Sequence, residues 1–349
     1  MPSPARLISL ATAVPPFVLR QDEVMAQARR LFQARGEEIE RLLPVYHNAG
    51  IETRYSCVPL EWYHAPGGWK EKNALFIHHA VELLRRAAHD CLARAGVPAE
   101  RVDTIVAVST SGIATPSLDA RLMEELPFRR DVERLPIFGL GCAGGVLGLA
   151  RAAAMARAAP GSLVLFLVVE LCGLTFRNSD VSNSNIIATA LFGDGAAAAL
   201  VTCERGAAGP EIAGWGEYTW PNTLEVMGWR VEEDGFGVQF SRDIPSIVRA
   251  RYGKAVDAFL ARQGLGRKDL AGTLCHPGGA KVLDALEEVF GLAPGGMTHA
   301  RAVLRDYGNM SGATVLFVLD RGLRGGLRGR HLVSSLGPGF SAGFLLIEA

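Results

Sequence analysis

A single cysteine, Cys142, lies in a glycine-rich stretch, residues 138–150, where an apolar run ends and a run of small helix-forming residues begins. Residues 135–140 are predicted to form a buried strand and residues 146–158 a helix, which places Cys142 in the turn at the helix N-terminus. The partial positive charge at this end of a helix stabilises a thiolate and lowers the pKa of the thiol. Cys142 is therefore a candidate nucleophile, and the alternative is a small buried apolar residue.

Two further polar residues lie in glycine-rich turns later in the chain. His276 ends a predicted strand, and Pro277 with the two glycines after it leaves space beside the imidazole. Asn309 follows Gly308 where another helix is predicted to begin. The alternatives are a structural histidine and a helix N-cap. A thiolate can attack a thioester with an imidazole as its ion-pair partner, and His276 and Asn309 can both donate to one developing oxyanion.

Strands and helices alternate along the chain, which predicts an α/β fold. The expected strands are residues 7–13, 104–109, 135–140, 162–169, 196–202, 273–276, 332–335 and 344–348. The expected helices include residues 73–95, 146–158, 246–263, 281–290 and 313–322.

An internal repeat indicates two similar halves, residues 1–205 and residues 206–349. Residues 92–108 and 260–276 each predict a helix end, a turn and a strand, and the same shift places Cys142 at Met310, beside Asn309. Chance similarity between two common β-α-β units is the alternative. Two duplicated halves would pack about a pseudo-twofold axis, so that the turns of Cys142, His276 and Asn309 could share one cleft.

The composition excludes several classes of function. The 349 residues carry 36 basic and 36 acidic side chains without a basic block, so neither nucleic acid nor a membrane surface is an expected partner. The six cysteines form no CxxC pair, which predicts no metal site and no disulfides, as in a cytoplasmic protein. The most apolar run, residues 162–169, is too short to span a bilayer.

Five ordered motifs resemble those of the type III polyketide synthases, the chalcone and stilbene synthase superfamily. They are residues 141–145 (GCAGG), 191–196 (LFGDGA), 276–279 (HPGG), 307–311 (YGNMS) and 337–339 (GPG). The resemblance implies a thiolase fold, in which two duplicated halves form a five-layer αβαβα sandwich, and a homodimer. It implies an acyl-CoA starter and malonyl-CoA as substrates, with no cofactor besides these CoA thioesters.

The resemblance also implies a role for each motif residue. Cys142 would carry the starter and then the growing chain, and His276 would hold it as a thiolate. His276 and Asn309 would stabilise the enolate that forms when malonyl-CoA loses CO₂. Phe192 would be the gate between the CoA tunnel and the cavity, where a core phenylalanine before a turn is the alternative.

Further positions are implied in the cavity wall and the CoA site. The cavity positions are Thr110, Ser111, Thr115, Glu170, Cys172, Thr175, Ser311 and Leu336. The CoA-binding positions are Arg54, Gly278, Gly279 and Lys281, where a surface role is the alternative for Arg54. Residues 227–240 should also line the cavity, although their spacing departs from the family. Cys172 stands where plant members have threonine, Thr115 where they have methionine, and Leu336 where they have an aromatic residue. These departures favour an aliphatic starter over a chalcone-type product.

The sequence therefore predicts repeated decarboxylative condensation with malonyl-CoA, followed by cyclisation to an alkylpyrone, an alkylresorcinol or a related phenol. The alternative within the same fold is a single-condensation enzyme of the β-ketoacyl-ACP synthase III type, which usually has His-Gln-Ala-Asn where this chain has HPGG. A papain-like amidase and an inactive binding homologue are the alternatives from other classes.

Overall fold

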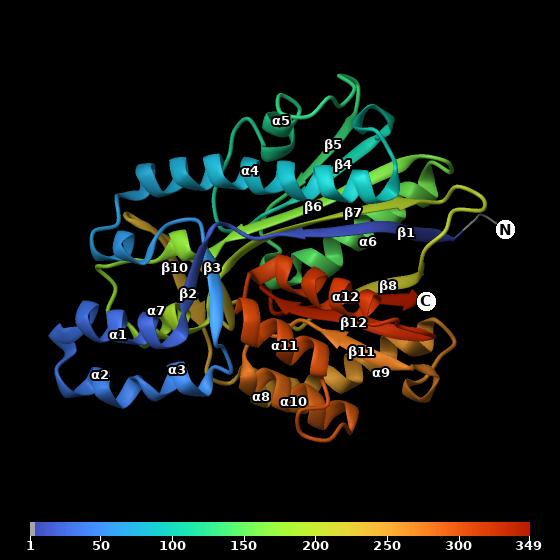
Figure 1. Ribbon diagram of the computed structural model, residues 1–349. Helices are drawn as coiled ribbons and strands as arrows, with labels where there is room; N and C mark the ends of the chain where they lie inside the picture. The colour runs from blue at the N-terminus through green and yellow to red at the C-terminus, as the bar shows by residue number, and fades with distance from the viewer. Residues whose placement is uncertain (1–3) are drawn as a thin grey trace.

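The computed structural model describes residues 4–349 and has a nine-stranded mixed sheet at its centre (Figure 1). Its strand order is β11-β12-β13-β8-β1-β7-β6-β4-β5. These strands are β1 (Ala5–Ala13), β4 (Thr104–Val108), β5 (Glu133–Ile137), β6 (Leu163–Leu171), β7 (Asp194–Thr202), β8 (Glu211–Thr219), β11 (Gly272–Cys275), β12 (Arg330–Gly337) and β13 (Ser341–Glu348). Two antiparallel pairs of strands lie outside this sheet. They are β2 (Phe17–Arg20) with β3 (Thr53–Ser56), and the hairpin of β9 (Met227–Glu232) with β10 (Gly235–Phe240).

Helices cover both outer faces and fill the centre. They are α1 (Gln21–Leu31), α2 (Glu37–Leu42), α3 (Pro44–Asn48), α4 (Trp69–Ala95), α5 (Leu118–Leu122), α6 (Gly144–Ala158), α7 (Asn183–Leu191), α8 (Ile244–Ile247), α9 (Gly253–Arg262), α10 (Ala280–Phe290), α11 (Thr298–Tyr307) and α12 (Thr314–Arg324). Short 3₁₀ turns, η4 (Gly141–Ala143) and η8 (Ser311–Ala313), lead into α6 and α12. Because buried residues recur in α4 at helical spacing, one face of that helix packs on the sheet, and the helix ends at Gly96 in the left-handed conformation.

The layers alternate between helix and sheet, as Figure 1 shows from top to bottom. Helix α4 packs on β1, β6 and β7, and α9 packs on β8 and β13 at the other side. Between the two parts of the sheet lie α6 and α12, and each contacts strands of both parts. The parts are joined through a short pairing of Ala5 and Arg6 in β1 with Ile212 and Glu211 in β8.

The strand arrangement of the first half recurs in the second. Strands β4, β6, β7 and β1 occupy places that match those of β11, β12, β13 and β8. In each set the first pair is parallel and the next two pairs are antiparallel. The predicted boundary after residue 205 lies in the connection between β7 and β8. Residues 1–3 of the predicted first half lie outside the described residues.

The turns before α6 and α12 touch at the centre of the molecule. A Cβ built at Gly145 would overlap the carbonyl oxygen of Gly312 and lie 2.6 Å from Cγ1 of Val315. A Cβ at Gly312 would in turn lie 3.0 Å from the carbonyl oxygen of Gly141. Only glycine permits this approach of two backbones.

The predicted strands and helices occur in the structure, with two corrections. Residues 135–140 are not a buried strand: β5 ends at Ile137 and is partly exposed because it is an edge strand with β4 as its neighbour. The helix predicted at residues 246–263 is α8, a π-helical segment (Val248–Tyr252) and α9 in succession. The sequence pattern did not indicate β2, β3, β8, the β9–β10 hairpin or α1–α3. Among these, β8 contains two glycines and is stabilised by pairing with β13.

Replacing Gly145 by alanine tests the central contact. Overpacking of a core costs about 1–3 kcal/mol, and we expect Gly145→Ala to lower the free energy of unfolding by about this amount in urea denaturation. Gly228→Ala is the matched control, because a Cβ there meets no atom within 4 Å. Equal losses in the two variants would contradict the importance of this contact.

Candidate active site

Cys142 lies in η4, at the start of α6, where the sequence predicts it. Its side chain is buried, with 6% exposed. The N–H of Gly141 donates to Oγ1 of Thr110 at 3.0 Å, just after β4. A Cβ at Gly141, whose φ is 49°, would lie 2.7 Å from Cδ of Pro338. The turn that carries Cys142 is therefore held between the end of β4 and the loop after β12.

Asn309 occupies the matching turn of the second half, between α11 and η8. Its Oδ1 accepts the N–H of Ser311 at 2.8 Å, and its Nδ2 donates to the carbonyl of Gly278 at 3.3 Å. The oxygen thus closes a tight turn two residues long, while the amide nitrogen keeps a second hydrogen for another acceptor. The alternative role of Asn309 as a helix N-cap is wrong, because the N-cap residue of η8 is Met310.

His276 follows β11, and its N–H donates to the carbonyl of Ser334 at 2.8 Å. The imidazole is 4% exposed, and neither ring nitrogen has a hydrogen-bond partner among the described residues. A Cβ at Gly278 would lie 3.9 Å from Nε2 of His276, so Asn309, bound to the Gly278 carbonyl, is placed beside the ring. Buried polar atoms are normally paired, and this exception indicates a place for a ligand.

The electrostatics differ from the prediction of a resting thiolate. Burial raises the pKa of Cys142 to about 12, although hydrogen bonding with Ser311 and Asn309 lowers it. Burial likewise lowers the pKa of His276 to about 3. The predicted effect of the helix N-terminus is therefore outweighed by desolvation, and burial favours the neutral thiol of Cys142 and the neutral imidazole of His276.

Glu170 organises the wall of the site next to Cys142. Its Oε2 accepts the N–H groups of Thr110 and Ser111 at 3.0 Å and the Ser111 hydroxyl at 2.7 Å. Burial nevertheless raises the pKa of Glu170 to about 7, and its Oε1 has no partner among the described residues. Because the Thr110 hydroxyl accepts the N–H of Gly141, Glu170 stabilises the turn of Cys142 indirectly, through Thr110.

Phe192 lies directly after α7 in an aromatic cluster that the sequence analysis did not identify. Its ring centroid is 5.9 Å from that of Trp229 and 5.6 Å from that of Phe240, both in the β9–β10 hairpin. Cys172 and Val238 belong to the same cluster. The alternation of these side chains along the hairpin could have indicated the cluster from the sequence. It was not recognised because the spacing of residues 227–240 departs from that of the family.

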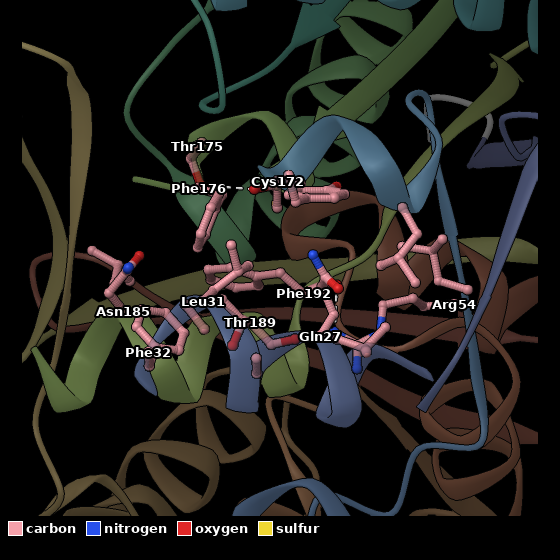
Figure 2. A pocket seen from close by; sticks show the side chains of 18 residues that line it. Gln27, Leu31, Phe32, Arg54, Cys172, Thr175, Phe176, Asn185, Thr189 and Phe192 are labelled. Carbon is pink, nitrogen blue, oxygen red and sulfur yellow. Dashed lines mark hydrogen bonds between the residues drawn. The ribbon is translucent and has the colours of Figure 1, made fainter. Parts of the chain in front are cut away.

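A cavity extends from this cluster toward α1, as Figure 2 shows. The space between its walls, including open solvent, measures about 630 Å³, and the walls are predominantly apolar. Cys172, Thr175 and Phe192 stand at one side, and Val24, Ala28, Leu31 and Phe32 come from α1 and the residue that follows it. The hydroxyl of Thr175 donates to the carbonyl of Cys172 at 2.7 Å, so this polar group in the cavity wall has a hydrogen-bond partner.

Residues 2–205 match the N-terminal domain family of chalcone and stilbene synthases, and residues 216–346 match the C-terminal domain family. The chain belongs to the chalcone and stilbene synthase family. It is a type III polyketide synthase, and the predicted α/β thiolase-like fold and condensing acyltransferase class are confirmed.

Relatives match this polyketide synthase along nearly its whole length. A putative chalcone synthase of Bacillus subtilis is 39% identical over 99% of this chain and 98% of its own. A 1,3,6,8-tetrahydroxynaphthalene synthase of Streptomyces peucetius is 36% identical over 97% of this chain and 91% of its own. The crystal structure of 1,3,6,8-tetrahydroxynaphthalene synthase from Streptomyces coelicolor has a TM-score of 0.93 at 29% identity and covers 98% of both chains.

Arg54 does not have the position that a CoA-binding role requires. The side chain is 3% exposed, and its guanidinium donates to backbone carbonyls at the end of α7. These contacts occupy Nη1 and Nη2 with acceptors of the protein itself, although Arg54 also lines the cavity of Figure 2. Gly278 and Gly279 form the turn between His276 and α10, and Lys281 is exposed in the first turn of that helix.

Of the eight predicted cavity residues, Cys172 and Thr175 line the cavity of Figure 2 in the single chain, and the other six do not. These six are Thr110, Ser111, Thr115, Glu170, Ser311 and Leu336. Thr115 is exposed on the surface, so a place in a cavity wall would require a second copy of the chain. Leu336 is buried in β12 within the main core. Ser311 is also buried, close to Cys142, and has a left-handed φ of 47°, a strained conformation that is frequent at functional sites.

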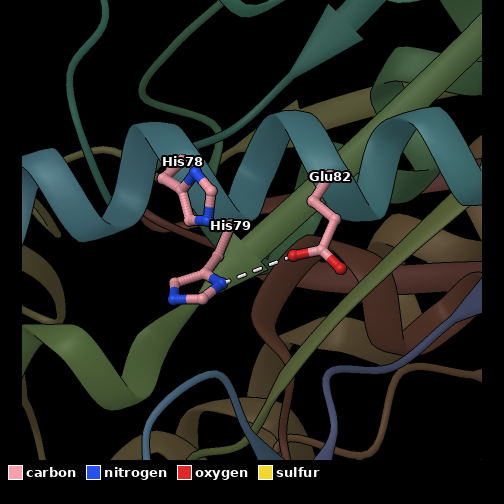
Figure 3. Close-up of side chains that lie close together, drawn as sticks. All are labelled: His78, His79 and Glu82. Carbon is pink, nitrogen blue, oxygen red and sulfur yellow. Dashed lines mark ion pairs between the residues drawn. The ribbon is translucent and has the colours of Figure 1, made fainter.

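Among the described residues, one group of side chains could hold a metal ion: His78, His79 and Glu82 on α4 (Figure 3). His79 and Glu82 form an ion pair at 3.7 Å. Helix α4 lies on the outer face of the sheet, away from α6 and Cys142, so this group has no part in the site (Figure 1).

None of the described helices combines the length and the apolar character that crossing a membrane requires.

The unpaired His276 ring predicts how Cys142 becomes reactive. Because burial opposes each separate charge, thiolate and imidazolium should form together by proton transfer between them. In His276→Gln no base is present, so we expect alkylation of Cys142 by iodoacetamide at pH 7 to be at least about tenfold slower, with its pH profile moved to higher pH. Mass spectrometry of the Cys142 peptide measures this rate. His299→Gln is the control, and a profile unchanged in His276→Gln would contradict the pairing.

Proposed function

We propose that this synthase loads a starter acyl group from acyl-CoA onto Cys142 and extends it by repeated decarboxylative condensation with malonyl-CoA. The observation that carries the proposal is the contact of the buried Cys142 with Asn309, whose amide also binds the carbonyl of Gly278 in the turn after His276. The imidazole of His276 is buried and has no partner among the described residues. No metal or redox cofactor is needed, because loss of CO₂ supplies both the carbanion and the driving force. Gly278, Gly279 and Lys281 would bind the CoA portion at the turn before α10.

In the loading step the thiol proton of Cys142 moves to His276, and the thiolate attacks the carbonyl carbon of the acyl-CoA. The C–S bond to CoA breaks, and the CoA thiolate takes the proton from His276. The buried site suits this step, because the reacting groups carry no net charge before the step or after it. Cys142 then holds the acyl group as a thioester.

In the extension step malonyl-CoA loses CO₂, and the electron pair of the broken C–C bond forms an enolate. His276 and the second Nδ2 hydrogen of Asn309 would donate to the enolate oxygen. The enolate carbon attacks the Cys142 thioester, the C–S bond breaks, and the β-ketoacyl-CoA can return to Cys142 for a further cycle. Donors already fixed in position stabilise charge that appears only during the reaction.

The starter that we propose is aliphatic, with cyclisation to an alkylpyrone, an alkylresorcinol or a related phenol. The apolar cavity between Cys172 and α1 supports this choice, since burial of each methylene contributes about 0.8 kcal/mol. We also propose that two copies of the chain form a homodimer. Ile113 and Phe138, 47% and 58% exposed, would be covered in that dimer beside Thr115.

Single variants separate loading from extension. We expect Cys142→Ala to lose covalent loading of the starter completely, because no nucleophile remains. Asn309→Ala should still load the starter but extend it at least about 100-fold more slowly, the usual loss for one oxyanion donor. Intact-mass spectrometry measures loading, and product formation from labelled malonyl-CoA measures extension. Covalent loading in Cys142→Ala, or no malonyl-dependent product with any starter, would overturn the proposed function.

The cavity predicts a dependence on acyl chain length. Ala28 faces the cavity from α1, so Ala28→Leu should shorten the preferred starter by a few carbons while acetyl loading stays unchanged. Ala26→Leu is the matched control because Ala26 is exposed on the same helix. Competition among acyl-CoAs of increasing length measures the preference. Identical length profiles for wild type and Ala28→Leu, or a strong preference for aromatic CoA esters, would contradict the aliphatic assignment.

A further inference from the structure

The buried guanidinium of Arg54 is bound to the backbone that carries Phe192. Nη1 donates to the carbonyls of Thr189 and, at 3.1 Å, Phe192, and Nη2 donates to the carbonyl of Ala190 at 3.0 Å. The carbonyls at the end of a helix lack partners within the helix and carry the negative end of its dipole. Arg54 therefore caps the C-terminus of α7 with a positive charge.

A second side chain completes this clamp from α1. Oε1 of Gln21 accepts a hydrogen bond from Nη2 of Arg54, and Nε2 of Gln21 donates to the carbonyl of Ala190 at 3.0 Å. The same Nε2 donates to the carbonyl of Tyr46 at 2.9 Å. The Ala190 carbonyl is thus held by two buried donors, and the end of α7 has little freedom to shift.

The segment that Arg54 holds is also the segment that holds Asn309. The N–H of Asn309 donates to the carbonyl of Leu191 at 2.8 Å, and the N–H of Gly193 donates to the carbonyl of Asn309 at 3.0 Å. Phe192, between these two partners, has its own carbonyl on Arg54. A displacement of residues 191–193 would therefore move both the Phe192 ring and the Asn309 amide.

Asp194 fixes the other end of this segment. Its carboxylate accepts the N–H of Cys57 at 2.9 Å and the N–H of Gly173 at 2.8 Å, which joins the segment to β3 and to the turn after Cys172. Arg54 and Asp194 lie close enough for each charge to favour the other. A buried cation is tolerated where an opposite charge and several carbonyls surround it.

We infer that Arg54 is a positioning residue, which sets the Phe192 gate and the enolate donor Asn309 through the backbone of residues 191–193. The inference rests on the proposed function, since it assigns the extension step to Asn309. Arg54 also lines the cavity of Figure 2, but in this role it acts through the backbone of residues 191–193 and not on the reacting atoms. Its loss should impair extension, which depends on Asn309, more than loading, which depends on Cys142.

The experiment compares Arg54→Met, Arg54→Lys and Arg157→Met with wild type. We expect Arg54→Met to load a short starter on Cys142 at close to the wild-type rate, but to decarboxylate malonyl-CoA about 100-fold more slowly, the scale of loss for a 1 Å misplacement. Arg54→Lys keeps the charge but reaches fewer carbonyls, so part of the extension rate should return. The Arg157 guanidinium binds the carbonyl of Ile212 at 3.0 Å far from the site, and Arg157→Met controls for lost stability.

The outcomes separate the inference from the proposed function. If wild type neither loads a starter nor releases CO₂ from malonyl-CoA, the proposed function fails. If wild type does both and loading and extension fall in parallel in Arg54→Met, as in a merely destabilised variant, the positioning role is overturned. Should Arg54→Met not fold, Gln21→Leu removes part of the clamp and keeps the charge. A selective loss of extension in Gln21→Leu supports the role, and an unchanged ratio of extension to loading overturns it.

Discussion

The close approach of two glycine turns at the centre of the molecule determines where the residues of the active site lie. Gly145 and Gly312 meet with no room for a Cβ, so α6 and α12 begin side by side between the two parts of the sheet. Cys142 and Asn309 lie in these turns or directly before them. A methyl group added at either glycine would force these turns to shift apart, and would therefore also shift the proposed nucleophile relative to the proposed enolate donor.

Each of these turns packs against a loop of the opposite half. A Cβ at Gly337 in the second half would lie 2.7 Å from the carbonyl of Leu140, beside Cys142. A Cβ at Gly308 would lie 2.9 Å from the carbonyl of Leu191 in the first half. Neither half therefore positions its own site residues without the other. Duplication of one strand arrangement, with the paired turns facing each other, accounts for a cleft built from residues that are distant in the chain.

The sequence was sufficient for the parts of the site that depend on local chemistry. Glycines around Cys142, His276 and Asn309 mark tight turns, and the alternation of strands and helices marks the fold class. Arg54 was assigned to CoA binding by resemblance to the family, with a surface role as the alternative. Its burial could not be predicted, because its acceptors lie as far as 138 residues away in the chain. The exposure of β5 depends on strand order, and the pKa of Cys142 depends on burial. Both are properties of the assembled molecule rather than of a segment.

Burial has opposite consequences for the two kinds of polar group at this site. Arg54 is surrounded by carbonyls and has Asp194 nearby, so it can remain charged although burial lowers its pKa to about 10. Within residues 4–349, His276 has no partner on either ring nitrogen, and Cys142 is favoured as a neutral thiol. Carbonyl groups therefore stabilise Nη1 and Nη2 of Arg54, whereas the ring nitrogens of His276 have no such partners among the described residues. Because fixed donors need not reorganise, charge that forms beside His276 and Asn309 during a reaction is stabilised more strongly than it would be in water.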